Sequence, residues 1–262
     1  MSTNSMRYRV PRACAQRGYS IVELMVAVTI GLFLLTGLFS ILQSTRDTST
    51  NQAALAQLQD NERIAVTMMS ETVQEAGYYP NASATLATSA FGTSTAFGKA
   101  GQLVVGGANP NGTSYGETVT VRYQNDATGT VLGCLGTADA VNIAHEYQFL
   151  IVPVVTNGTS VPTLECAKDG NTAVPLVANV TNLTFFYGVA SNGATAANTY
   201  LTATQLNANQ TAGVSPDWTN VYSVKMTLTF NNPLYGQPGQ TLQQTVSFTR
   251  VVSIMSKNGV NT

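Results

Sequence analysis

Residues 19–42 form the longest apolar run of the chain, and Glu23 is the only charged residue in it. A helix needs about 20 apolar residues to cross the hydrocarbon core of a bilayer, so the run predicts a membrane-spanning helix. Four arginines lie before it: Arg7, Arg9, Arg12 and Arg17. Because basic residues flank the cytoplasmic side of such helices, we expect a cytoplasmic N-terminus and an extracytoplasmic remainder.

The junction before this run differs from an ordinary secretory signal, which has an apolar core of about 7–15 residues followed by a cleavage site of small residues. Here Gly18 precedes the aromatic Tyr19, and Glu23 follows four positions later. A carboxylate inside a membrane-spanning helix costs about 2.5–3.5 kcal/mol, so it is normally kept for a partner or a function. The alternative is that Glu23 lies near the lipid head groups, stays hydrated and has no role.

This junction resembles the class III signal of type IV pilins and pseudopilins. The resemblance implies that residues 1–18 are a leader, that the prepilin peptidase cuts between Gly18 and Tyr19, and that it methylates the new amine of Tyr19. Phenylalanine is the usual first residue of the family, so Tyr19 is a mild departure. Glu23 becomes the fifth mature residue. In a filament its carboxylate would meet the terminal amine of a neighbouring subunit, in surroundings that screen charge poorly.

The helix is expected to continue beyond the membrane, over residues 19–77 in all, because no proline or glycine follows residue 42 until Gly77. Apolar and small side chains recur there at helical spacing and predict one buried stripe. These are Leu55, Leu58, Ala65, Met68, Thr72 and Ala76, with Ile64, Met69 and Val73 beside them. Gly31 and Gly37 stay open to two interpretations, since glycine weakens a helix interior but lets membrane helices approach closely.

Residues 78–262 read as a β-rich extracytoplasmic domain, with short β-branched and aromatic runs between turn-forming residues. Strands are predicted at 102–105, 118–123, 148–155, 183–187, 221–230 and 245–254. The alternation in residues 224–230 predicts that the even positions face a core and the odd ones face solvent. Two stretches rich in Ala, Ser, Thr and Asn, 81–97 and 189–213, predict surface loops. The fold class is therefore α+β, with an antiparallel sheet packed on the long helix.

This layout resembles the pilin fold, and three segments look like those of PilW-type minor pilins, which are thought to prime pilus assembly near the filament tip. The segments are Glu75-Ala76-Gly77-Tyr78, Leu132-Gly133-Cys134 and Leu164-Glu165-Cys166. The resemblance implies assembly rather than catalysis as the function.

The three cysteines are an odd number, which normally suggests a leftover thiol. Cys14 falls in the leader, so processing would leave Cys134 and Cys166 as a pair. An exported domain lies in an oxidising compartment, and we therefore expect a disulfide between them. The alternative is two buried free thiols in a cytosolic domain.

Composition and motifs argue against other kinds of function. Charged residues make up 10% of the chain and the net charge is −1, so no basic patch for nucleic acid is expected. His145 is the only histidine, which excludes a zinc site of several imidazoles, and we place it at the surface or a strand edge. Asn125, Asp126 and Asp169 lack EF-hand spacing. We expect no cofactor, no metal and no enzyme, and Trp218 buried under a loop rather than at a subunit contact.

The leading hypothesis is a minor pilin that takes part in type IV pilus assembly or priming. Its expected partners are the prepilin peptidase, other major and minor pilins, the inner-membrane assembly platform and membrane lipid. The expected location is the bacterial inner membrane, as a single-pass protein, and then the pilus or cell surface. A pseudopilin of a type II secretion system, a pilus-associated adhesin and a membrane-tethered enzyme remain alternatives.

Overall fold

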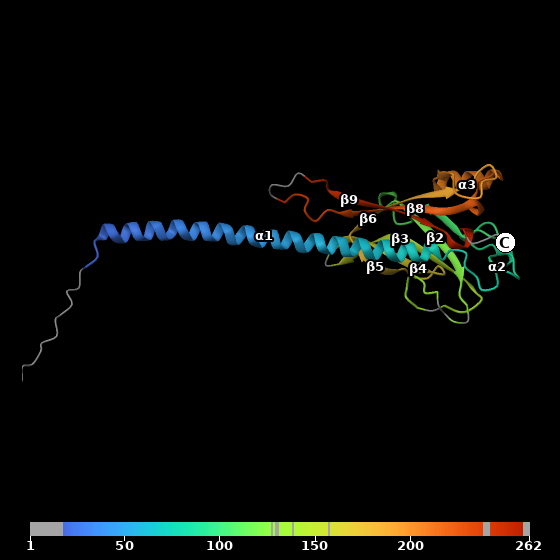
Figure 1. Ribbon diagram of the computed structural model, residues 1–262, viewed down its shortest axis with the longest axis horizontal. Coiled ribbons are helices and arrows are strands. Elements are labelled where there is room, and N and C mark those ends of the chain that lie inside the picture. The colour runs from blue at the N-terminus through green and yellow to red at the C-terminus, as the bar shows by residue number, and fades with distance from the viewer. Residues whose placement is uncertain are drawn as a thin grey trace, which may run out of the picture. The chain divides into compact units, whose positions relative to one another are not determined.

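The computed structural model describes residues 18–126, 128, 131–137, 139–156, 158–237 and 242–258. Cys14 and the four arginines of the predicted leader lie outside these residues. The chain forms two compact units, Met1–Gln52 and Ala53–Thr262, and each is described by itself. Figure 1 shows the order of the elements.

Helix α1 (Ile21–Gln74) supplies the described part of the first unit and continues into the second. It begins two residues after Tyr19 because Ser20 caps it: the Ser20 Oγ accepts a hydrogen bond from the Val22 N–H at 3.4 Å, and the Ser20 carbonyl accepts one from the Leu24 N–H at 3.1 Å. By length and composition, α1 is the one helix within the described residues that could cross a membrane.

The second unit contains two antiparallel sheets instead of the single sheet that we predicted. The first sheet has the order β1-β2-β3-β4-β5, and each strand is joined to the next along the chain. Its strands are β1 (Val104–Ala108), β2 (Glu117–Gln124), β3 (Ala144–Thr156), β4 (Thr159–Lys168) and β5 (Val174–Ala178). The second sheet, with the order β7-β6-β8-β9, consists of β6 (Val180–Val189), β7 (Thr199–Leu201), β8 (Val221–Asn231) and β9 (Thr245–Ser253).

Short helical segments complete this unit: α2 (Ala87–Ala90), η1 (Thr113–Tyr115), α3 (Ala203–Ala212), η2 (Trp218–Asn220) and α4 (Met255–Asn258). Helix α3 and strand β7 lie in the stretch 189–213, so the prediction of a surface loop there was wrong. The Thr202 side chain caps α3 together with Gln205, and Gly213 ends it in the left-handed conformation. Both signals are readable in the sequence.

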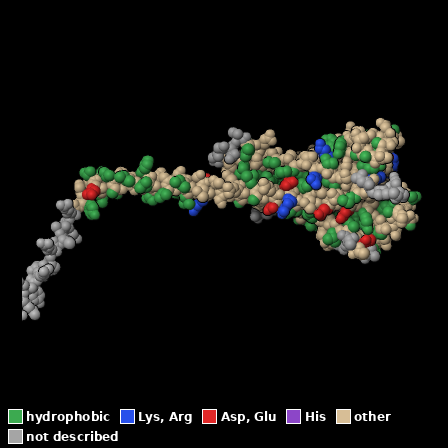
Figure 2. Space-filling model, viewed as in Figure 1, with side chains coloured by type: hydrophobic (Ala, Val, Ile, Leu, Met, Phe, Trp, Pro, Cys, Tyr) green, Lys and Arg blue, Asp and Glu red, His purple; other side chains and the backbone are tan. Residues whose placement is uncertain are grey.

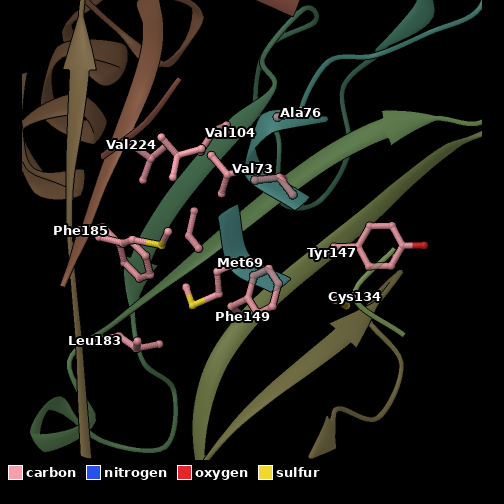
Figure 3. Close-up of a cluster of buried hydrophobic side chains, with 14 of the residues drawn as sticks. Met69, Val73, Ala76, Val104, Cys134, Tyr147, Phe149, Leu183, Phe185 and Val224 are labelled. Carbon is pink, nitrogen blue, oxygen red and sulfur yellow. The ribbon is translucent and has the colours of Figure 1, made fainter. Parts of the chain in front are cut away.

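The hydrophobic core lies between the sheets and the C-terminal half of α1. The buried residues of α1 are Leu58, Ala65, Met69, Thr72 and Val73, and Ala76 just past its end is also buried. Figure 3 shows Met69 and Val73 among side chains from both sheets, including Phe149 and Phe185. The predicted stripe was wrong at Leu55 and Ile64, which are 36% and 45% exposed. Ile64 lies one position away from the buried Ala65, on the outer side of the helix.

The alternation predicted for residues 224–230 is confirmed. Val224, Met226, Leu228 and Phe230 are fully buried, and Lys225, Thr227 and Thr229 are half-buried on the opposite face. An antiparallel sheet covered on one face requires this period of two.

The end of α1 is held by segments distant in the sequence. Gly77 adopts a φ of 77°, and its N–H donates to the Arg122 carbonyl at 2.8 Å. The Ser256 hydroxyl in α4 donates to the Ala76 carbonyl at 2.7 Å. Carbonyls at a helix C-terminus have no partner within the helix, and the Ser256 hydroxyl satisfies one such carbonyl just past the end of α1.

Candidate functional site

The Gly18–Tyr19 junction lies just before α1 in non-helical backbone, and Tyr19 is 85% exposed. A Cβ atom added to Gly18 would meet nothing within 4 Å, and no positive φ demands glycine there. The fold itself therefore does not require a glycine at position 18. A requirement for it would have to come from a protein that reads this junction.

The first part of α1 exposes apolar side chains on all its faces. The large apolar residues from Tyr19 to Leu42 are each between 50% and 85% exposed. Figure 2 shows this run of hydrophobic side chains along the helix. The hydroxyls of Thr29 and Thr36 donate back to helix carbonyls, at 2.9 Å to Val26 and 2.8 Å to Leu32, so they add no unsatisfied polar group. Such a surface needs lipid or other apolar helices to cover it.

Glu23 lies in the first turn of α1 and carries the only charge of the apolar segment. No described residue forms a hydrogen bond or an ion pair with it. A negative charge in the first turn stabilises the helix by its interaction with the macrodipole. Ser20 and Glu23 also have the spacing of a capping box. The capping-box spacing is readable in the sequence but did not enter the prediction for Glu23. The carboxylate is thus placed at the helix start, where an incoming amine could reach it.

Gly31 and Gly37 lie inside the same segment, and α1 stays helical through both. A Cβ atom at either position would meet nothing within 4 Å. Packing within the chain therefore does not explain these glycines, whereas close approach of another helix would use them.

The predicted disulfide between Cys134 and Cys166 is present, with a Cα–Cα distance of 6.4 Å. It joins the segment 131–137 to β4, and both cysteines are buried. Gly133 lies against the Tyr147 ring, where a Cβ atom would approach the ring to 2.2 Å. The bond therefore holds an irregular segment against the first sheet.

A buried polar cluster lies next to the disulfide. The Asp139 carboxylate, with its side chain fully enclosed, accepts hydrogen bonds from the Tyr123 and Tyr147 hydroxyls and pairs with Lys168. Burial alone would raise the pKa of Asp139, but the hydrogen bonds from Lys168 and Tyr147 and the Lys168 charge outweigh it and lower that pKa. The cluster is satisfied internally, which indicates a structural role.

His145 was wrongly placed at the surface or a strand edge. It is 8% exposed in β3, which lies between β2 and β4, and its Nδ1 is 2.8 Å from the Asp169 Oδ2. The error arose because β3 begins at Ala144, four residues before the predicted strand.

Within the part of the chain that the structure describes, no three His, Cys, Asp or Glu side chains gather as a metal site. Trp218 is buried in η2 and donates to the Asn207 Oδ1 at 2.7 Å.

Two family models match the chain. The model of the type IV pilus-assembly protein W (PilW) family matches residues 152–256, from β3 to α4. The prokaryotic N-terminal methylation motif matches residues 14–39, which include Gly18, Tyr19 and Glu23. No curated protein and no solved structure matches the chain.

Proposed function

We propose that the chain, a type IV pilin similar to PilW-type minor pilins by its two family matches, takes part in assembling or priming a type IV pilus near the filament tip. The observation that carries the proposal is the exposed apolar segment of α1, which begins at a Gly-aromatic junction and holds one acidic residue in its first turn. We propose no catalytic role.

Maturation in this proposal begins with the prepilin peptidase. It cuts between Gly18 and Tyr19, removes residues 1–18 and methylates the amine of Tyr19. The peptidase would read Gly18 directly, which explains a glycine that the fold does not need. Residues 19–42 then anchor the protein in the inner membrane, the helix continues to Gln74 instead of the predicted residue 77, and residues 78–262 form the extracytoplasmic domain.

Assembly then depends on Glu23. Its carboxylate has no partner among the described residues, and burial in a bundle of pilin helices would be costly without one. The terminal amine of a neighbouring subunit supplies an opposite charge and sets the axial register. Other pilins, the assembly platform and lipid are the remaining proposed partners.

The test compares Glu23→Ala with wild type and with Asp47→Ala, which removes a carboxylate of α1 outside the apolar run. Mass spectrometry should show that all three proteins begin at Tyr19. Glu23→Ala should stay in the membrane as processed protein and be depleted at least about tenfold from sheared pili. A tenfold depletion corresponds to a loss of about 1.4 kcal/mol of assembly free energy. Asp47→Ala should enter pili normally. Recovery of Glu23→Ala in pili at the wild-type proportion, or a mature N-terminus other than Tyr19, would refute the proposal.

A pseudopilin would share this maturation and pairing. Deletion of the gene distinguishes the two functions, because loss of surface pili supports the pilus role, whereas loss of protein secretion with pili intact would contradict it.

A further inference from the structure

Strand β9 is an outer strand of the second sheet, and within the described residues nothing pairs with its outer edge. It is nine residues long, whereas the other edge strands β1, β5 and β7 have five, five and three. An edge strand presents a row of backbone N–H and C=O groups that another chain can pair with. This strand is therefore the longest open edge of the described domain.

The features that usually protect such an edge are missing from β9. The strand contains no proline, glycine or lysine, and its register with β8 runs through nine consecutive pairs without a bulge. Arg250 is its only charged residue. Five of the nine residues are valine or β-branched threonine, which favour extended backbone. The edge is regular and competent to accept a further strand.

The side chains of β9 are incompletely covered on the core side. Phe248 and Val246 are half-buried, although their partners on β8, Leu228 and Phe230, are fully buried. The rings of Phe248 and Phe230 lie edge to face, with centroids 5.8 Å apart. On the opposite face, Val251 is 50% exposed. One more strand would complete the burial of these apolar groups.

We propose that β9 pairs with an extended segment of a different pilin-type subunit, which adds a fifth strand to the second sheet. This rests on the proposed function, since a pilus supplies neighbours in the same orientation. Arg250 is exposed and forms no ion pair within the described part of the chain. Residues directly opposite one another share a face of the sheet. The incoming strand should therefore carry an acidic residue opposite Arg250 and apolar residues two positions away on each side, opposite Phe248 and Val252.

A second copy of this chain does not fit the edge by antiparallel self-pairing. That pairing reverses the strand direction and, with it, every element of the same unit. The part of α1 within the second unit runs roughly along β9 (Figure 1). In the two copies, the parts of α1 that lie within the second unit would then run in opposite directions, whereas neighbours in a pilus share one orientation.

The experiment uses the full chain in its host envelope, with a photo-cross-linking amino acid at Thr249 on β9. Matched positions are Tyr200 on β7, which is 45% exposed at the opposite edge of the same sheet, and Phe33 on α1. Thr249 should cross-link to an extended segment of another pilin-type subunit that has the apolar-x-acidic-x-apolar pattern. Tyr200 should not cross-link to that segment, and Phe33 should cross-link to pilin helices.

Arg250→Glu provides the second measurement, because this exposed side chain can be reversed without disturbing the core. It should reduce the Thr249 cross-link about tenfold, as expected when an attractive cross-strand pair becomes repulsive. A lysine in place of the partner's acidic residue should restore it. Two outcomes would overturn this inference and leave the proposed function standing. One is a pilin cross-link from Phe33 with none from Thr249, and the other is a Thr249 cross-link only to a second copy of this chain. Failure at both positions would overturn the proposed function as well.

Discussion

Glu75 follows the last residue of α1 and offers a sharp test of burial at the helix end. Its side chain is half-buried, but its Oε2 is enclosed and accepts no hydrogen bond from the described residues. Burial, and next the charge of Glu71 one helical turn before it, raise the pKa of Glu75 from 4.5 to about 7. A carboxylate near a helix C-terminus is also opposed by the macrodipole. Glu75→Gln keeps the shape and removes the charge.

The sign of the effect follows from the raised pKa. Between 4.5 and about 7 the unfolded chain releases the proton while the folded chain keeps it, so rising pH lowers the free energy of unfolding in this window. Above the folded pKa the full cost of the buried charge is present. It corresponds to at most about 3 kcal/mol, and screening of a half-exposed side chain reduces it to about 1–2 kcal/mol. Glu75→Gln should gain that amount at about pH 8 and almost nothing at about pH 4.

Urea unfolding of the full chain in detergent measures this gain. Trp218 is the only tryptophan and is 2% exposed, so its fluorescence reports unfolding of the domain. Glu71→Gln is the matched control. It removes only the smaller of the two causes that raise the pKa of Glu75, so its gain in the free energy of unfolding at about pH 8 should be smaller. Equal gains of Glu75→Gln at the two pH values would show that ionisation of Glu75 carries no cost, and would refute the reasoning.

Two further predictions use the same fluorescence measurement. Replacing Cys134 and Cys166 together by serine should lower the free energy of unfolding by about 2–4 kcal/mol, because the unfolded chain regains the freedom of the closed loop; an unchanged urea midpoint would contradict this. Arg122 is 2% exposed and donates to the carbonyls of Phe91, Gly92 and Gln102. Arg122→Met should lower the free energy of unfolding by about 3–5 kcal/mol, because it leaves these acceptors unpaired. Arg63→Met, at an exposed position, should change it by less than about 0.5 kcal/mol. Similar losses in the two variants would argue against a stabilising role of the Arg122 hydrogen bonds.

Local patterns sufficed for the apolar part of α1, for the core-facing residues of β8 and for the pairing of Cys134 with Cys166. Each depends on a short period or on the sorting of a few residues between leader and domain. The same reasoning failed at β4 and β5, where prolines and polar residues mask the strand signal. It failed again at α3, whose caps are readable although its ten residues are almost all polar or small.

The separation into two sheets, the burial of His145 and Glu75 and the open edge of β9 required the tertiary structure. Each depends on which strand lies beside which, and β8 pairs with β6 across the intervening β7 and α3. Such pairings join residues far apart in the sequence, so no local period records them. The sequence by itself determined an apolar, glycine-preceded helix with one acidic residue at its start, because hydropathy and charge act along the chain. Only the packed domain decided which side chains are buried and which sheet edge stays exposed to water, because burial depends on neighbours brought together in space.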